Sequence, residues 1–278
     1  MSVQENKDKV QREALNTWAL AGCEGTIEAA TAFGKTRVGV LAISYYAKKV
    51  DYNFKALIVT PTTAIQEEWR KEFKKWGESR VLKECVEIYC INTAREFVGR
   101  CYNIAVFDEI HNYINGEVNY KVFKNNVFDR TLGLSASIDN SLLPSLSLVA
   151  PICYALTTYD ALELGLISEF TVYNLPIELT TQEEAEYRSL SADITYTWTT
   201  YNRQAWKKIG ERKDIVYKAA NKLGIVEEIS SYFKSSYGIV FSQTKNYADI
   251  VQDTIGDACV VHHSGLSTKK RIANLKKT

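Results

Sequence analysis

The sequence is poor in the residues that build metal centres and covalent cross-links. Only His111, His262 and His263 are histidines, and the six cysteines form no C-x-x-C pair. Both shortages argue against a structural zinc site, and cysteines placed mostly in apolar stretches are typical of free thiols in a reducing compartment. We therefore expect an intracellular protein: cytoplasmic, in the host cytoplasm if it is viral, or nuclear if it is eukaryotic.

Long hydrophobic runs and an excess of one charge are absent as well. No apolar segment approaches the length of a membrane span, and the charged residues 1–16 contain no signal-peptide core. The formal net charge is only +1, so any nucleic-acid contact must come from local basic patches. With 46% hydrophobic residues, the 278-residue chain can form one large or two modest domains with real cores.

The first half of the sequence contains short apolar runs that alternate with helical patterns. Strands are expected at residues 25–30, 56–60, 85–91, 103–107 and 130–136, and helices at 35–47 and 63–76. In the second of these helices Ile65, Trp69, Phe73 and Trp76 recur at helical spacing, and we expect them to be core residues rather than a base-stacking platform. The alternation predicts an α/β fold with a mostly parallel sheet and helices on both faces.

The regular alternation of strands and helices ends near Leu166. Residues 167–179 look extended, and residues 181–232 form a long helical region without proline. A strand at 237–242, a helix at 245–255 and a strand at 257–264 then open a second α/β unit. We expect a first domain over residues 1–166 and a second, incomplete one over residues 167–278.

The segment AATAFGKT, residues 29–36, is close to the phosphate-loop pattern G-x-x-x-x-G-K-[ST], with Ala29 in place of the first glycine. Gly34 can supply the tight turn, Lys35 a cation for the β- and γ-phosphates, and Thr36 a hydroxyl for Mg²⁺. An ordinary strand-to-helix turn is the alternative, since a GK[ST] triplet arises by chance in roughly one chain in seven of this length.

A pair of carboxylates follows a later strand. In NIAVFDEIH, residues 103–111, Asp108 stands where a strand ends and can hold Mg²⁺, while Glu109 can orient or deprotonate an attacking water. If the two acids stood alone, a solvated turn after a strand would be the better explanation. Because a strand, a GKT loop and a helix precede the two acids in the sequence, the metal site is the stronger interpretation.

These residues carry a resemblance to a known family. Asp108-Glu109-Ile110-His111 resembles the DExH box of superfamily 2 helicases and translocases, and residues 30–36 are similar to their A-x-T-G-x-G-K-T loop. The resemblance implies RecA-like domains that bind ATP and Mg²⁺, with Lys35, Asp108 and Glu109 as catalytic residues and Thr36 and Asp108 as metal ligands. The implied nucleotide-binding residues are Gln11, which reads adenine, and Ala30, Thr31, Ala32, Phe33, Gly34, Lys35 and Thr36.

Position 32 departs from the family, which usually has glycine there. Alanine resists a positive φ and adds a methyl group beside the phosphates, which bears on the tightness of nucleotide binding and on turnover.

Further motifs follow in the family's order. The resemblance implies nucleic-acid contacts from Pro61, Thr62, Thr63, Asn92 and Thr93. It implies a role in coupling hydrolysis to strand movement for His111, Ser135 and Ser137, the serines lying in LSAS. Residues 238–251 and 262–271 resemble the start of the second RecA-like domain. The likeness is greatest to the branch that holds repair helicases, phage recombination helicases and restriction-enzyme translocases.

Later motifs of the family, which supply an arginine finger, have no counterpart, since no G-R-x-x-R pattern occurs. The chain therefore resembles a motor that is truncated at its C-terminus. We expect an ATP hydrolase that acts as a helicase or translocase, on DNA rather than RNA, without a membrane partner and with an unidentified loading or completing protein. The alternative is a non-unwinding, nucleic-acid-binding or regulatory fragment that binds ATP weakly. Another P-loop NTPase, such as a small kinase, fits the ordered motifs less well.

Overall fold

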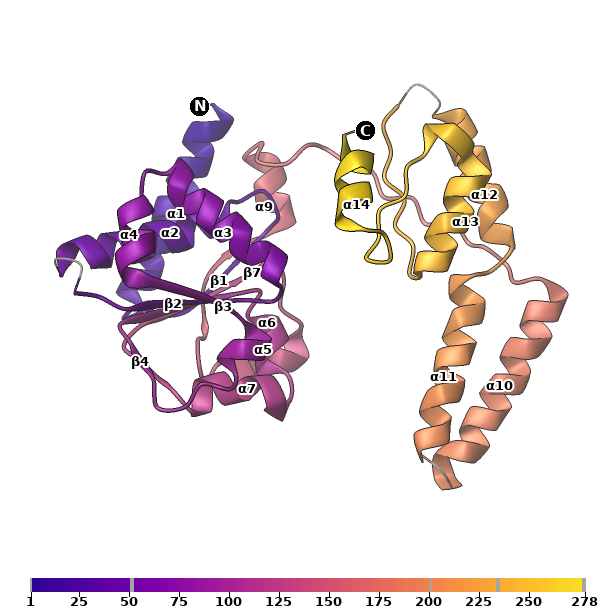
Figure 1. Cartoon of the computed structure of the whole chain (residues 1–278), viewed down its shortest axis with the longest axis horizontal. Helices are drawn as coiled ribbons and strands as arrows, with labels where there is room; N and C mark the ends of the chain where they lie inside the picture. The colour runs from indigo at the N-terminus through magenta and orange to yellow at the C-terminus, as the bar shows by residue number, and fades with distance from the viewer. Residues whose placement is uncertain (1, 51–52, 201, 234–235, 277–278) are drawn as a thin grey trace. The chain divides into compact units, whose positions relative to one another are not determined.

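The computed structural model describes residues 2–50, 53–200, 202–233 and 236–276. The chain divides into two compact units, Met1–Thr171 and Val172–Thr278 (Figure 1). The sequence placed this boundary after residue 166, and Leu166 is buried in the core of the first unit. The assignment of the second unit to an incomplete RecA-like domain stays a prediction.

A six-stranded sheet in the order β3-β2-β5-β7-β1-β8 organises the first unit, and every neighbouring pair in it is parallel. Its strands are β1 Glu24–Ala29, β2 Ala56–Thr60, β3 Val86–Cys90, β5 Ile104–Asp108, β7 Thr131–Ser135 and β8 Ile152–Leu156. A separate parallel pair is formed by β4 Cys101–Tyr102 and β6 Val127–Phe128. The predicted α/β fold with a parallel sheet is confirmed.

Helices cover both faces of this sheet (Figure 1). In the first unit they are α1 Val3–Leu20, α2 Lys35–Lys49, α3 Thr63–Lys75, α4 Ser79–Cys85, α5 Ile91–Ala94, α6 His111–Ile114, α7 Glu117–Lys124, α8 Leu143–Leu146 and α9 Thr158–Glu163, with a 3₁₀ turn at Asn140–Leu142. Strands β2, β5 and β7 are buried along their whole length, because side chains on both of their faces meet a helical layer.

The core is divided by the sheet into two clusters. Trp18 and Trp69 belong to the cluster under α1 to α4, and Phe107 and Tyr113 to the one under α5 to α8. Trp69 and Phe73 are fully buried, which confirms that the aromatic stripe of α3 is core.

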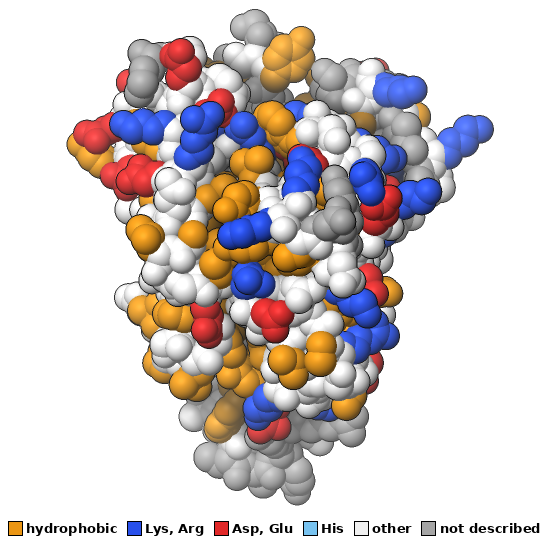
Figure 2. Space-filling view, turned by 90° about the vertical axis from the view of Figure 1, so that its left-hand side faces the viewer, with side chains coloured by type: hydrophobic (Ala, Val, Ile, Leu, Met, Phe, Trp, Pro, Cys, Tyr) orange, Lys and Arg blue, Asp and Glu red, His pale blue; other side chains and the backbone are white. Residues whose placement is uncertain are grey.

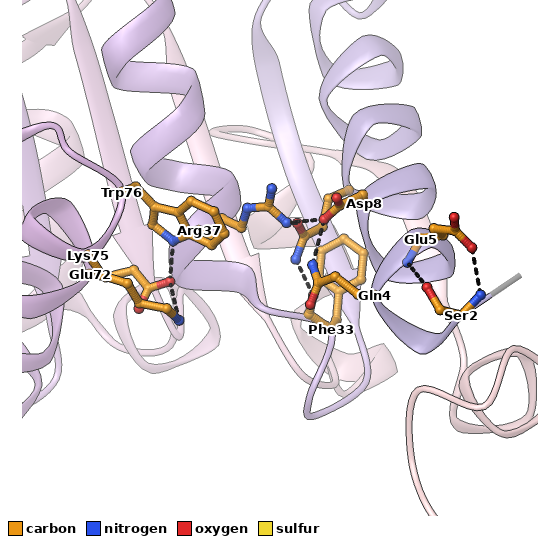
Figure 3. Close-up of polar contacts among 10 residues, drawn as sticks. Ser2, Gln4, Glu5, Asp8, Phe33, Arg37, Glu72, Lys75 and Trp76 are labelled. Carbon is orange, nitrogen blue, oxygen red and sulfur yellow. Dashed lines mark hydrogen bonds and ion pairs between the residues drawn. The ribbon is translucent and has the colours of Figure 1, made fainter.

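Helix α1 and strand β8 are among the elements of the first unit that the sequence did not predict. Helix α1 begins at a capping box, in which the Ser2 backbone N–H donates to Glu5 Oε2 at 2.7 Å and the Glu5 N–H donates to Ser2 Oγ at 3.3 Å (Figure 3). Strand β8 lies at the edge of the sheet and is only partly buried, although its sequence ICYAL is apolar throughout.

The second unit is helical in the residues that the structure describes. It contains α10 Thr181–Thr200, α11 Asn202–Tyr217, α12 Asn221–Tyr232, α13 Lys245–Ile255, a 3₁₀ turn at Gly256–Ala258 and α14 Thr268–Leu275. The predicted helical region 181–232 consists of three helices, of which α10 and α11 pack on each other as a hairpin. The predicted helix at 245–255 is confirmed as α13.

The strands predicted at 237–242 and 257–264 are wrong. In both segments the described residues form no strand, and Ile239 and Phe241 are 80% and 91% exposed. An apolar segment becomes a strand only when its backbone pairs with a neighbour, and no described strand of the second unit offers one.

The surface of the first unit is mixed in character. Figure 2 shows Lys and Arg side chains interspersed with Asp, Glu and hydrophobic ones on one face. This mixture agrees with the small net charge of +1 and leaves only local patches for an anionic partner. None of the helices in the described part of the chain combines the length and hydropathy of a membrane span.

Candidate nucleotide and nucleic-acid site

The predicted motifs meet at one edge of the sheet. Because all six strands are parallel, their carboxyl ends lie on the same side, where α/β proteins bind their ligands. At this edge β1 runs into the loop of residues 30–34, β5 ends in Asp108, and β7 ends in Ser135. Strand β5 pairs with β7, with Asp108 opposite Leu134.

The loop between β1 and α2 requires two left-handed residues. Gly34, the N-cap of α2, has φ 88°, and a Cβ at this position would lie 2.5 Å from Gln11 Nε2. Ala32 has φ 68°, a region that costs a residue with a Cβ roughly 1–2 kcal/mol. The position where the family usually has glycine therefore needs a positive φ here too, and alanine adopts it under strain.

Lys35 is the first residue of α2, and its side chain points back toward the end of β1. Its Nζ donates to the Ala29 carbonyl at 2.9 Å. Burial lowers the pKa of its ammonium below the ordinary value, while the nearby carboxylates of Glu109 and Asp108 act in the opposite direction. The structure thus brings the three predicted catalytic residues, Lys35, Asp108 and Glu109, close together.

The two carboxylates differ in their surroundings. Asp108 is 7% exposed, and the indole Nε1–H of Trp69 donates to its Oδ2 at 2.8 Å. Burial raises the pKa of the Asp108 carboxyl, an effect that the Trp69 hydrogen bond opposes. Glu109 is half-buried and has a left-handed backbone with φ 54°. A strained, non-glycine residue at this place is typical of a functional position.

The predicted coupling residues are in contact. His111 Nδ1 lies 2.8 Å from Ser135 Oγ, and the Ser135 hydroxyl donates to the Ser137 carbonyl at 2.8 Å. His111 Nδ1 is also 3.5 Å from Glu109 Oε2. The end of β5 and the end of β7 are therefore joined through one imidazole ring, and Ser137 takes part through its backbone oxygen.

Glu28 extends this connection to β1, which runs into the loop of residues 30–34. Its Oε1 accepts a hydrogen bond from the Ile138 backbone N–H at 2.8 Å, which ties the LSAS loop to β1. Sequence reasoning missed Glu28, because a single acid within a buried strand carries no pattern.

Gln11 belongs to a polar network that bridges α1 and α2, of which Figure 3 labels Asp8, Phe33 and Arg37. Its Nε2 donates to the Phe33 carbonyl at 2.6 Å, and its Oε1 accepts from Arg37 Nη1 at 2.7 Å. Arg37 also pairs with Asp8 and lies 3.9 Å above the Trp76 ring. Gln11 is only 1% exposed, so in this structure its amide fastens the loop to α1. Asp8 and Arg37 were not predicted, and no spacing in the sequence marks them.

The remaining loop residues face different environments. Thr31 and Ala32 are exposed, whereas Ala30 and Phe33 are buried. The Phe33 ring packs in the core with its centroid 6.3 Å from that of Tyr154, so Phe33 can offer a ligand only its backbone. Gly34, Lys35 and Thr36 are half-exposed at the start of α2.

The predicted nucleic-acid contacts lie just beyond the ends of two neighbouring strands. Thr62 and Thr63 follow β2, Asn92 and Thr93 follow β3, and these four side chains are exposed. Pro61 is half-buried, and its carbonyl accepts from the Cys90 thiol at 3.3 Å, which links the ends of β2 and β3. The structure therefore presents these polar side chains from adjacent strand ends.

The donor set fits a nucleoside triphosphate with a divalent cation. The Thr36 hydroxyl and the Asp108 carboxylate are hard oxygen ligands of the kind that Mg²⁺ prefers, and Lys35 offers a cation for phosphate. Gly34 keeps the backbone close to Gln11 in a way that no larger residue allows.

Comparison with known proteins gives one family match. Residues 5–96, about a third of the chain, match the family described as "Type III restriction enzyme, res subunit". No curated protein sequence matches the chain.

Two solved structures are similar at a distant level. The SWI2/SNF2 ATPase core of Sulfolobus solfataricus, solved with double-stranded DNA, has 14% identity and a TM-score of 0.45 over 98% of this chain and 74% of its own. The UvsW helicase of bacteriophage T4 has 16% identity and a TM-score of 0.39 over 53% of this chain and 58% of its own. Likeness at this level is too low to identify an activity.

The family match covers the loop and its flanking elements, and the sheet places the DEIH and LSAS motifs beside that loop. The first unit is thus an α/β domain with a parallel sheet, and its residues 5–96 are similar to that res subunit family.

Proposed function

We propose that the chain is the ATP-binding part of a nucleic-acid motor, a helicase or translocase that acts on DNA and hydrolyses ATP with Mg²⁺. One observation carries the proposal: the ammonium of Lys35, at the start of α2, lies within electrostatic reach of both Asp108 and Glu109. A cation for phosphate beside two carboxylates is the arrangement that phosphoryl transfer needs. The choice of DNA rests on the resemblance of the motifs to the DNA-acting branch of the family.

Each residue at the sheet edge has a role in this proposal. Lys35 binds the β- and γ-phosphates, and Thr36 and Asp108 hold the metal ion, which supplies positive charge against the phosphates when it is bound. Glu109 orients the attacking water and accepts its proton. The α2 N-terminus directs its backbone N–H groups toward the phosphates.

The contact between His111 and Ser135 provides a route from hydrolysis to nucleic acid. A change at Glu109 reaches His111, which is 3.5 Å away, and then the LSAS loop through Ser135. The exposed hydroxyl and amide groups of Thr62, Thr63, Asn92 and Thr93 would meet the sugar–phosphate backbone, which accounts for half or more of protein–DNA hydrogen bonds.

A second candidate is a non-unwinding fragment of such a motor that binds ATP weakly. Two observations favour it. Ala32 holds a strained conformation where glycine would be relaxed, and both ends of the Gln11 amide are engaged by Phe33 and Arg37. A nucleotide that needs this amide must compete with contacts already made.

Binding and hydrolysis measurements separate the two candidates. Binding of a fluorescent ATP analogue is followed by anisotropy with and without Mg²⁺. Hydrolysis is measured alone and with single-stranded DNA, duplex DNA and RNA of equal length. We expect Mg²⁺-dependent binding and a hydrolysis rate that DNA increases, both lost in Lys35→Ala.

Each other result of these binding and hydrolysis measurements leads to a different conclusion. Binding without any increase by nucleic acid supports the second candidate, stronger stimulation by RNA corrects the substrate, and absence of ATP binding rejects both candidates.

A further inference from the structure

A buried tryptophan contacts the predicted metal ligand from another part of the chain. Trp69, on α3, donates its indole N–H to Asp108 Oδ2 at 2.8 Å. Trp69 is 0% exposed and Asp108 is 7% exposed, so water competes little for this hydrogen bond. Hydrogen bonds to an ionised acceptor are roughly twice as strong as neutral ones.

The fold makes specific room for this indole. A Cβ at Gly39, on α2, would lie 2.4 Å from Trp69 Cη2 and 3.3 Å from Val106 Cγ1 on β5. Only glycine at position 39 therefore lets the ring pass between α2 and β5 to reach Asp108. Gly39 belongs to α2, the helix that begins with Lys35 and Thr36. The space for the Trp69 ring therefore lies beside the helix that carries two residues of the proposed nucleotide site.

The chemistry of a carboxylate gives the bond a consequence. An acceptor held at Oδ2 cannot rotate freely, and its other oxygen, Oδ1, is left in one defined direction for a metal ion or a metal-bound water. Groups that hydrogen-bond to metal ligands in this way orient the ligand, and their loss typically costs about 10- to 100-fold in metal affinity or activity.

We propose that Trp69 is a positioning residue of the metal site, which holds the Asp108 carboxylate in the orientation that Mg²⁺ binding requires. This role rests on the proposed ATP·Mg²⁺ site. It differs from simple packing because it depends on one N–H group and not on the volume of the ring.

The variant Trp69→Phe tests that difference, since phenylalanine keeps an aromatic ring but has no N–H group. Trp18→Phe is the matched control: Trp18 is 1% exposed and its indole donates to the Thr131 carbonyl at 2.9 Å, away from the carboxylates. Binding of the fluorescent ATP analogue is titrated with Mg²⁺ and repeated in EDTA, and unfolding is followed for both variants.

In Trp69→Phe we expect the Mg²⁺ concentration for half-maximal binding to rise about 10- to 100-fold, with unchanged nucleotide affinity in EDTA. In Trp18→Phe the Mg²⁺ dependence should equal that of the wild type, although both variants lose stability. Equal Mg²⁺ dependence in the two variants would overturn the role of Trp69 and leave the proposed function standing.

A spectroscopic measurement on the unaltered protein covers the case in which Trp69→Phe does not fold. With ¹⁵N-labelled tryptophan, the signals of the other four indoles are assigned by their loss in single Trp→Phe variants, which leaves the fifth signal to Trp69. Addition of Mg²⁺ and ATP should then move the Trp69 signal and leave the Trp18 signal in place. Signals that both stay unchanged while Mg²⁺-dependent ATP binding is observed would contradict the proposal. A wild-type protein without Mg²⁺-dependent binding rejects the proposed function, and the positioning role with it.

Discussion

The Nδ1 atom of His111 lies 2.8 Å from the Oγ atom of Ser135, and this contact joins two motifs that are 24 residues apart in the chain. The hydroxyl of Ser135 continues to the carbonyl of Ser137, so the two serines contribute different atoms. The link depends on the side chain at position 135 and on the backbone at position 137.

Removal of the first hydroxyl should therefore have the larger effect. In Ser135→Ala we expect ATP binding to persist while the stimulation of hydrolysis by DNA falls several-fold, because the imidazole loses its partner in the LSAS loop. Ser137→Ala keeps the carbonyl and should stay closer to the wild type. Hydrolysis rates with and without single-stranded DNA measure both variants, and equal losses would show that the exposed hydroxyl of Ser137 matters as much.

Lys35→Ala should abolish nucleotide binding without unfolding the protein. A hydrogen bond to a charged group contributes about 1.5–3 kcal/mol, which corresponds to a loss of affinity of at least tenfold. Lys49→Ala, at the exposed far end of the same helix, is the control and should bind like the wild type. Anisotropy of a fluorescent ATP analogue gives both affinities. Unchanged affinity in Lys35→Ala would place the nucleotide elsewhere.

The two carboxylates should respond differently to amide substitution. Asp108→Asn removes the charge from the proposed metal ligand and should raise the Mg²⁺ concentration needed for ATP binding. Glu109→Gln should retain ATP·Mg²⁺ but lower the hydrolysis rate by about 10²- to 10⁴-fold, because only the proton acceptor is lost. Isothermal titration and single-turnover hydrolysis measure the two effects. A similar loss of binding in both variants would argue against this division of roles.

The strain at Ala32 can be released by one substitution. Ala32 is exposed and has φ 68°, so Ala32→Gly removes a methyl group without opening a cavity. We expect ATP binding to tighten or to stay unchanged, with an unfolding free energy that rises by no more than about 1 kcal/mol.

Ala30→Gly is the matched control for this loop. Ala30 is buried and its φ is not positive, so glycine there should destabilise the protein. Weaker ATP binding in Ala32→Gly would mean that the methyl group is packed usefully in the bound state.

The sheet of the first unit was predictable because its central strands are buried on both faces. Such strands read as continuous apolar runs, and β2 and α3 begin where the sequence predicts them. The edge strand β8 was not predicted, although its residues ICYAL are all apolar; only Leu156 among them is buried. The segments at 237–242 and 257–264 show the limit of the same signal, because apolar character predicts burial but not the presence of a pairing partner.

Only the site residues that belong to a sequence motif could be predicted. Lys35, Asp108, Glu109, His111 and Ser135 come together because each lies at or just beyond the carboxyl end of a strand of one parallel sheet. Trp69 was recognised from its spacing only as a core residue, since nothing local relates it to a carboxylate 39 residues later. The pairing of Arg37 with Gln11 and Asp8 likewise depends on how α1 packs beside α2, which periodicity does not specify.

The order of strands in the sheet also bears on how the protein is made. Strand β1 lies between β7 and β8, which begin at Thr131 and Ile152, far later in the chain than Glu24. At ordinary rates of synthesis the ribosome needs about 5–20 s to add the residues that separate β1 from β7. During that interval the nucleotide loop has no hydrogen-bonded neighbour on either side of its strand. The loop thus belongs to the late, non-local stage of folding, and the nascent chain must keep an apolar strand from aggregating until its partners arrive.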